Sequence, residues 1–211
     1  TSIMGLEIGK VYDANTVKRL PYRHLAIFAD QDTDGAHICG LLINFIHVHH
    51  PSLLRAAPDF ITRFATPIIR ATLRGSRHDF FSVREFQLWK EGVATPSSLS
   101  VKYYKGLGTS TSAEAKAYFS KWNDHAIAVR YEGEECDSTM QLFFEGGNAE
   151  QRKTMLSTAD FEERFVDYAH THTTIRDFML NEVIHFSWAD VQRSIPSAMD
   201  GLKVSQRKTL F

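Results

Sequence analysis

The sequence has little cysteine and almost no net charge, and both absences exclude classes of protein. Only two cysteines, Cys39 and Cys136, occur among 211 residues, and they form no CxxC pair. This argues against a disulfide framework and a thiolate zinc site, and it fits a reducing compartment. The 24 Lys and Arg residues nearly balance the 25 Asp and Glu residues. The whole chain therefore has no field that would indicate an anionic partner, and any nucleic-acid surface must be local.

Long apolar runs are also absent. The longest, at residues 41–46, is far too short to cross a bilayer, and the N-terminus lacks the apolar core of a signal peptide. We therefore expect no membrane partner. The chain begins with Thr1 and stops in mid-pattern at Phe211, so we expect it to be an excised part of a longer protein. Its 43% hydrophobic composition is enough to bury a sizeable core.

Strand-like and helix-like patterns alternate along the first 130 residues. Apolar runs predict strands at residues 25–29, 64–73, 80–83 and 101–104, and helical spacing predicts helices at 37–50, 84–90 and 113–122. Thr111 and Glu114 have the spacing of a capping box at the start of the last helix. The alternation predicts an α/β fold, with a largely parallel sheet flanked by helices on both faces.

Beyond residue 130 the pattern changes. Charged and glycine-containing residues predict an irregular or helical connection over residues 131–174. Helical apolar spacing returns at residues 175–186. We therefore expect three parts: an α/β domain at 1–130, the connection, and the truncated start of a mostly helical domain at 175–211.

The densest chemical signal is an acidic loop at residues 30–35, which reads DQDTDG and follows an apolar strand. Its carboxylates, Asp30, Asp32 and Asp34, repel one another unless a cation or protons neutralise them. Mg²⁺ accepts a few carboxylates together with waters and phosphate oxygens. Ligands of open α/β sheets bind beyond the carboxyl ends of strands, where these side chains should lie. The loop therefore predicts a divalent-metal site.

Three other interpretations fit this loop less well than a Mg²⁺ site. An EF-hand needs a bidentate Glu at the twelfth position, where Leu41 stands, and a helix before the loop. A haloacid-dehalogenase phosphotransferase would have Thr or Val where Asp34 stands. A solvated turn needs no alternation of three Asp residues.

Three segments together resemble the type IIA DNA topoisomerases of the eukaryotic type. Residues 28–45 (FADQDTDGAHICGLLINF) resemble the Toprim motif, and residues 103–112 (YYKGLGTSTS) resemble a second signature of that family. Residues 193–208 (RSIPSAMDGLKVSQRK) resemble the entry into its winged-helix domain. The resemblance implies a Toprim domain at 1–130 and the start of a winged-helix domain at 175–211.

The resemblance also implies roles for residues. Asp30, Asp32 and Asp34 would be catalytic and would hold Mg²⁺, for which Mn²⁺ or Ca²⁺ could substitute in binding. An upstream Glu and an attacking Tyr of the family are not in this chain, and Glu7 lies outside the family's E-G-D-S-A pattern. The chain alone should therefore be inactive.

Contacts to DNA phosphates are predicted for two basic segments and for His37. In the second signature Lys105 supplies charge, and Gly106 and Gly108 allow close approach of backbone amides. The last 21 residues carry four cations and one anion, a net charge of 4 − 1 = +3. The cations are Arg193, Lys203, Arg207 and Lys208. A strand-to-helix turn, a helix-capping His37 and a solvated basic helix face are the alternatives.

The sequence departs from the family pattern at two places, and it contains two groups of histidines that could suggest a zinc site. Val204 and Ser205 replace the usual Pro-Gly, and residues 145–148 replace a Lys-rich stretch, so a DNA contact there is in doubt. Of the histidines at 47, 49 and 50, only two share a helix face, and no third zinc ligand is evident. The histidines at 170 and 172 give no clearer site.

The function that this resemblance implies is ATP-dependent passage of one DNA duplex through another. The chain would supply the metal site of the cleavage and religation gate, with double-stranded DNA and a second protein copy as partners. ATP would bind outside this chain, and the protein would act in the nucleus or on organellar DNA. The alternatives are a non-catalytic nucleic-acid or subunit-interaction module and another Toprim enzyme, a primase or nuclease.

Overall fold

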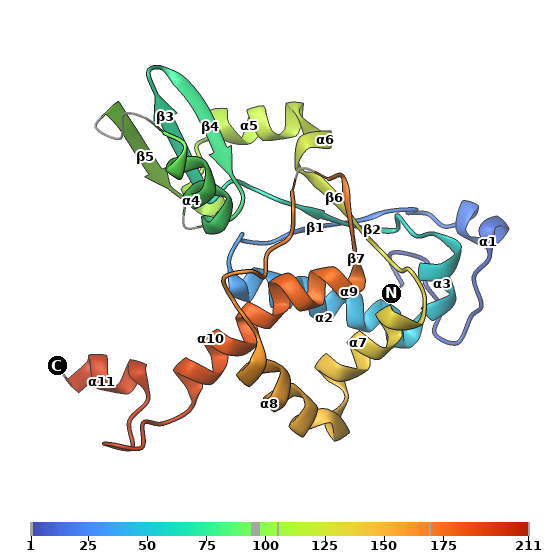
Figure 1. The fold of residues 1–211 in the computed structure, drawn as a ribbon. Coiled ribbons are helices and arrows are strands. Elements are labelled where there is room, and N and C mark those ends of the chain that lie inside the picture. Colours follow the sequence, from blue (N-terminus) through green and yellow to red (C-terminus); the bar gives the residue numbers. More distant parts are fainter. Residues whose placement is uncertain (1, 94–97, 105, 169, 211) are drawn as a thin grey trace.

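A computed structural model describes residues 2–93, 98–104, 106–168 and 170–210. Two sheets and a layer of helices form the molecule (Figure 1). The four-stranded sheet has the order β1-β2-β6-β7, with β1 Leu25–Phe28, β2 Ile61–Phe64, β6 Ala126–Arg130 and β7 His172–Thr174. The three-stranded sheet has the order β4-β3-β5, with β3 Ile69–Leu73, β4 Ser76–Phe80 and β5 Leu99–Tyr103.

The predicted α/β class, with helices flanking a sheet, is confirmed. Parallel pairing occurs between β1 and β2 and between β6 and β7. The central pair β2 and β6 is antiparallel, as is the whole second sheet. The chain leaves the first sheet after β2, forms the second sheet, and re-enters beside β2 in the opposite direction (Figure 1).

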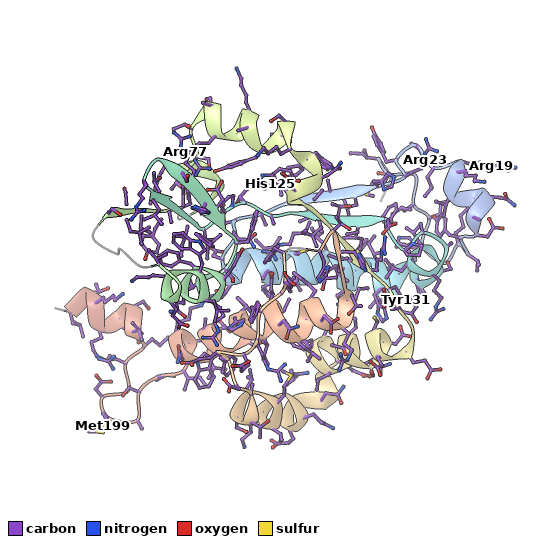
Figure 2. All side chains as sticks on the ribbon, turned by 45° about the horizontal axis from the view of Figure 1, so that its top comes forward. Arg19, Arg23, Arg77, His125, Tyr131 and Met199 are labelled. Atoms are coloured by element: carbon purple, nitrogen blue, oxygen red, sulfur yellow. The ribbon has the colours of Figure 1, made fainter. Side chains whose placement is uncertain are left out.

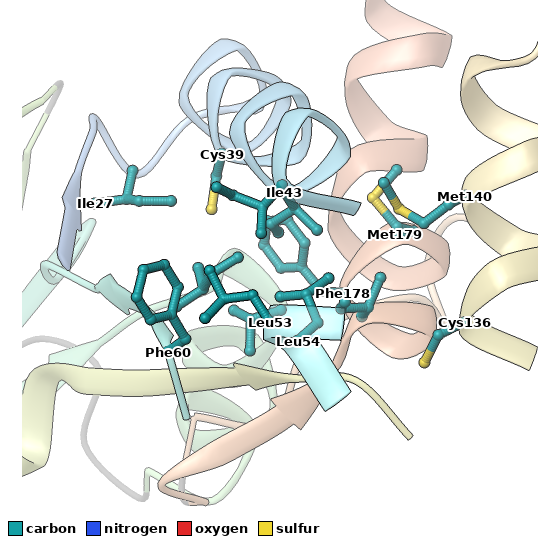
Figure 3. Packing of buried hydrophobic residues seen from close by; sticks show 14 of the residues in the cluster. Ile27, Cys39, Ile43, Leu53, Leu54, Phe60, Cys136, Met140, Phe178 and Met179 are labelled. Atoms are coloured by element: carbon teal, nitrogen blue, oxygen red, sulfur yellow. The ribbon is translucent and has the colours of Figure 1, made fainter. Parts of the chain in front are cut away.

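One face of the four-stranded sheet carries the main core. Ile27, Ile61 and Val129 from three strands are buried in one cluster with residues of the covering helices. Figure 3 shows this packing around Ile43, Phe178 and other labelled side chains. The helices concerned are α2 Thr33–His49, α3 Pro51–Ala56, α7 Glu134–Phe144 and α9 Ile175–Phe178, together with the π-helical turn η4 Met179–Val183.

Aromatic rings cover part of the opposite face. Phe64 of β2 stacks on Phe119 at 5.2 Å between centroids and lies 5.4 Å from the ring of His125. The Nδ1 atom of His125, labelled in Figure 2, lies 2.8 Å from the backbone oxygen of Ala65. These contacts bring α5 Ser112–Ser120 and α6 Trp122–His125 onto the sheet.

Two strand predictions were wrong in their bounds. Residues 64–73 contain the last residue of β2 and the whole of β3, because Pro67 cannot donate a backbone hydrogen bond to a continuous ladder. The strand predicted at 80–83 ends at Phe80, since the Ser82 side chain accepts from Glu85 N and caps α4 Val83–Glu91. The predicted helix at 113–122 divides in two, but its capping box between Thr111 and Glu114 is confirmed.

The connection at 131–174 is helical for much of its length. It contains α7 and α8 Ala149–Thr158, separated by the 3-10 turn η3 Gly146–Asn148. Within the irregular or helical connection that the sequence predicted, residues 134–144 and 149–158 are thus helical. Gly133, at φ +94, makes the turn into α7. Three acidic residues in the first turn of α7 interact favourably with the positive end of the helix dipole.

The last part of the described chain continues from the core. The segment α9–η4 is followed directly by α10 Ile184–Ser194, and α11 Val204–Leu210 lies beyond a loop. Ile175 and Val183 belong to the same buried cluster as α2. Met199 in the loop is 94% exposed and projects away from the body in Figure 2. Domain boundaries at 130 and 175, and a winged-helix identity for the last part, stay predictions.

The remaining elements are short. They are α1 Ala14–Lys18, near the N-terminus, and the 3-10 turn η2 Leu107–Thr109, between β5 and α5. No helix among the described residues has the length and apolar character needed to cross a membrane.

Candidate metal centre

Asp30 lies at the centre of the site, in the loop between β1 and α2. A Cβ atom added to Gly35 would lie 1.9 Å from the backbone oxygen of Asp30. A Cβ added to Gly106 would lie 2.6 Å from Oδ1 of the same residue. Real Cβ atoms do not approach other atoms this closely. Gly35 meets backbone and therefore requires glycine, whereas a side chain at position 106 would have to displace the Asp30 carboxylate. The acidic loop and the second signature, which are far apart in sequence, therefore meet at the Asp30 carboxylate.

The three aspartates have different surroundings. The Asp32 side chain caps α2, because its Oδ1 accepts from Gly35 N at 2.7 Å. Asp34 lies in the first turn of α2, and both its oxygens accept from the guanidinium of Arg193, at 2.7 and 3.1 Å. These hydrogen bonds hold the pKa of Asp34 below its ordinary value.

The oxygen donors fit a hard cation only in part. Among the residues that the structure describes, no group of three or more His, Cys, Asp or Glu side chains is arranged as a ligand set. Asp30 and Asp32 still offer carboxylate oxygens at the end of a strand. Mg²⁺ is commonly bound by one or two carboxylates, with waters and phosphate oxygens completing its shell. The arrangement therefore suits a Mg²⁺ ion whose shell is completed by a phosphate and waters better than one bound by protein ligands alone.

A buried polar network holds the acidic loop from behind. Arg63 of β2 is 3% exposed and donates to Gln31 Oε1 at 3.1 Å and to the Tyr168 hydroxyl at 3.0 Å. It also forms an ion pair with Glu182 of η4, which accepts from the Tyr168 hydroxyl as well. Gln31 in turn donates to Tyr168 at 2.7 Å. Burial lowers the pKa of Arg63, and Asp32 opposes that shift.

The sequence analysis missed this network. The signal that could have revealed it is a lone Arg in the apolar pattern of β2, since an unpaired charge cannot remain buried there. Gln31, Asp32, Arg63 and Glu182 line an open cavity of about 440 Å³ next to the loop. The network holds the side chain of Gln31, which lies between Asp30 and Asp32 in the sequence. It therefore restricts the backbone that carries both carboxylates.

Outside the second signature, the residues predicted to contact DNA divide into three groups. His37 is half-buried, its ring stacked on Phe186 at 3.8 Å, and burial lowers its pKa. Arg193 and Arg207 are paired with carboxylates, Arg207 with Asp200 at 2.8 Å. The side chains of Lys203 and Lys208 have no ion pair within the described part of the chain, and both line an open hollow of about 410 Å³ with Arg193.

The three residues of the second signature that were predicted to contact phosphate have different surroundings or lie outside the described chain. Gly106 provides space for Asp30, whereas a Cβ added to Gly108 would meet nothing within 4 Å. Lys105 lies outside the described residues. Phosphate contacts by these three residues stay predictions.

The histidines around the end of α2 do not assemble a metal site among the described residues. His47 Nε2 lies 2.6 Å from Asp137 Oδ1, which joins α2 to α7. His50 is fully buried at the start of α3 and packs against the ring of Tyr12. His47 therefore links two helices, and His50 belongs to the packing beneath Tyr12.

Comparisons with known proteins identify relatives of the whole chain. The family model described as the C-terminal associated domain of TOPRIM matches residues 64–191. The chain is 44% identical to DNA topoisomerase 2-alpha of Gallus gallus and 41% identical to the mitochondrial DNA topoisomerase 2 of Dictyostelium discoideum. These alignments cover 99% and 100% of this chain but only 14% and 16% of the relatives.

A solved structure gives the same relationship. The fold superposes with a TM-score of 0.86 and 39% identity on the crystal structure of the Plasmodium falciparum topoisomerase II DNA-binding, cleavage and re-ligation domain. That match covers 100% of this chain and 28% of the other. The chain therefore belongs to the family of the C-terminal associated domain of TOPRIM and is a homologue of the type II DNA topoisomerases.

Proposed function

We propose that this chain is the metal-binding part of the DNA cleavage and religation gate of an ATP-dependent type II DNA topoisomerase. The observation that carries the proposal is the meeting of the acidic loop with Gly106 at the Asp30 carboxylate. Two signatures separated by some seventy residues form one site, at the strand end where ligands of α/β sheets bind. The identity to topoisomerases over the whole chain favours this function over a primase, a nuclease or a non-catalytic module.

Asp30 and Asp32 are the proposed ligands of Mg²⁺, which Mn²⁺ or Ca²⁺ could replace for binding. When bound, the cation would polarise the scissile phosphate and stabilise the leaving sugar oxygen. Gly106 leaves room for the Asp30 carboxylate and Gly35 for the Asp30 backbone, and the Gly35 amide orients Asp32. Gln31 and Arg63 hold the loop between the two ligands, so the carboxylates need little reorganisation on binding.

The remaining parts of the reaction come from outside these residues. The attacking Tyr, an upstream Glu ligand and the ATP site are proposed to lie in other segments of a longer protein that acts as a homodimer. Double-stranded DNA would bind through phosphate contacts of Lys105, Lys203 and Lys208. We propose nuclear DNA as the substrate, although one relative is mitochondrial.

The test uses a full-length topoisomerase that carries this segment. Asp30→Asn and Asp32→Asn should each abolish Mg²⁺-dependent cleavage and relaxation of supercoiled plasmid, because the phosphate loses its bound cation. Asp124→Asn, at an exposed carboxylate of α6, is the matched control and should retain activity. Normal cleavage by either loop variant would contradict the proposed function.

A further inference from the structure

The third aspartate of the acidic loop is bound by a residue 159 positions away in the chain. Asp34 Oδ1 and Oδ2 accept from Arg193 at 2.7 and 3.1 Å, which is the bidentate geometry of a strong carboxylate–guanidinium pair. Arg193 Nε also lies 3.2 Å from Asp190 Oδ1, one turn earlier on α10. The Arg193 guanidinium is therefore held between one carboxylate of α2 and one of α10.

Two ring contacts strengthen the same junction. His37, one turn after Asp34, stacks on Phe186 with centroids 3.8 Å apart and rings 5° from parallel. The guanidinium carbon of Arg193 lies 5.5 Å from the centroid of the same Phe186 ring. Residues three, four and seven apart share a helix face, so this set is a continuous contact between α2 and α10.

We infer that Asp34 is a positioning residue that fastens α10 to the acidic loop, and that Asp30 and Asp32 hold the divalent cation without it. Both oxygens of Asp34 already accept from Arg193, and a cation bound there would have to displace that guanidinium or lie against its positive charge. Asp34 thus has a role different from that of its two neighbours. The metal part of this inference rests on the proposed function, whereas the junction does not.

The junction would set where the basic C-terminal segment lies relative to the metal. α10 ends at Ser194, and Arg193 lines the same open hollow as Lys203 and Lys208. Fastening α10 at Asp34 therefore fixes the point from which both lysines extend. The distance between the cation and these two lysines, which would both contact the DNA backbone, would then be constant.

The first test needs no metal. Asp34→Asn, Arg193→Gln and the double variant of the 211-residue chain are compared by amide hydrogen exchange over α10. Asp34→Asn should speed exchange at residues 184–194 about fivefold, and the double variant should be no faster than Arg193→Gln, because the Asp34–Arg193 pair is already lost in that single variant. Exchanging the charges, with Asp34→Arg and Arg193→Asp, should restore part of the protection, because the pair between positions 34 and 193 forms again while Asp190 faces a carboxylate. Additive effects, or no effect, would overturn the junction.

The second test separates the roles of the aspartates by Mn²⁺ binding, followed by electron paramagnetic resonance. Asp32→Asn should abolish binding, while Asp34→Asn and Arg193→Gln should change the affinity by less than about threefold. Loss of Mn²⁺ binding in Asp34→Asn, with tighter binding in Arg193→Gln, would show Asp34 to be a ligand that Arg193 competes for, and would overturn the assignment. No binding by the unaltered chain would contradict the proposed function and the role assigned to Asp32, and the exchange data would still decide the junction.

Discussion

Asp30 lies against glycines from two segments, Gly35 of its own loop and Gly106 of the second signature. The sequence predicted Gly106 as a place where backbone amides approach a phosphate. Its missing side chain instead makes room for the Asp30 carboxylate. Sequence spacing could not predict this contact, because it depends on how η2 and the loop after β1 meet in space.

The first prediction concerns this contact. Gly106→Ala should displace the Asp30 carboxylate, since its Cβ would lie 2.6 Å from Oδ1, and it should weaken Mg²⁺ binding at least tenfold, or about 1.4 kcal/mol. Gly108→Ala is the matched control, because its Cβ would meet nothing within 4 Å. Isothermal calorimetry would measure both affinities. Equal affinities for the two variants would show that the space at Gly106 is not needed.

Arg63 lies just before the strand predicted at residues 64–73, and the sequence analysis gave it no role. Its charge is buried beside Glu182, and its two Nη atoms also donate to Tyr168 and Gln31. Its Nε has no hydrogen-bond partner within the described residues. A buried pair of this kind contributes little net stability, but removing one partner leaves the other charge uncompensated.

The second prediction follows from this asymmetry. Glu182→Ala should lower the free energy of unfolding by about 3–5 kcal/mol, and the double replacement Arg63→Met with Glu182→Met should cost less than the single change. The control is Glu163→Ala, where an exposed carboxylate lies 3.7 Å from Arg84 and the change should stay within about 0.5 kcal/mol. Urea denaturation measures all three. A double variant less stable than Glu182→Ala would contradict this account.

At the scale of elements, the sequence predicted correctly those strands, helices and caps that depend on residues close together in the chain. The strand before the acidic loop, the helix that follows it and the capping box of α5 all depend on residues within a few positions, and the structure contains each. The errors arose where one residue changed the outcome. Pro67 interrupted an apolar run, and Ser82 began a helix where a strand was expected. The pairing of β2 with β6 is non-local and could not be derived from either strand alone.

Glu114 joins the start of α5 to the three-stranded sheet. Its Oε1 accepts from the Tyr104 hydroxyl at 2.6 Å, from Lys102 at 2.9 Å and from Arg70 at 3.0 Å. The hydrogen bond from Tyr104, followed by that from the Thr111 amide, lowers the pKa of Glu114 from 4.5 to about 2. The ionised form is thus favoured by folding.

The third prediction is the pH dependence that this pKa implies. The contribution of Glu114 to stability is fully present above pH 4.5 and is lost as pH falls towards about 2, because the folded state binds its proton less readily than the unfolded state. Glu114→Gln should therefore be less stable than the unaltered chain at pH 7, and the difference should shrink through this window. Thermal unfolding across pH measures it. A constant difference from pH 7 to pH 2 would rule out this linkage.

At the scale of the whole molecule, the basic C-terminal segment was predicted from charge alone, and the structure divides its members. Arg193 and Arg207 already pair with carboxylates, whereas the side chains of Lys203 and Lys208 lack ion pairs within the described residues. Net charge could not reveal this division, since it depends on which acids the fold brings near. The two lysines are therefore the better candidates for phosphate contacts.

The fourth prediction tests that division. In a full-length protein carrying this segment, Lys203→Ala and Lys208→Ala should each reduce the slope of log K against log salt for duplex DNA by about 0.9, the value for one phosphate contact. Arg207→Ala should change the slope less, because its guanidinium is bound to Asp200. Fluorescence anisotropy at several salt concentrations gives the slopes. Unchanged slopes for both lysine variants would remove them from the DNA interface.

The central claim is that the acidic loop binds a divalent cation through Asp30 and Asp32. Its most direct test is a calorimetric titration of Mg²⁺ into the 211-residue chain, with Asp30→Asn, Asp32→Asn and the surface control Asp124→Asn alongside. We expect weak binding by the unaltered chain and the control, because phosphate and other ligands are absent, and no binding by either loop variant. Isotherms of the two loop variants that match that of the unaltered chain would contradict the claim.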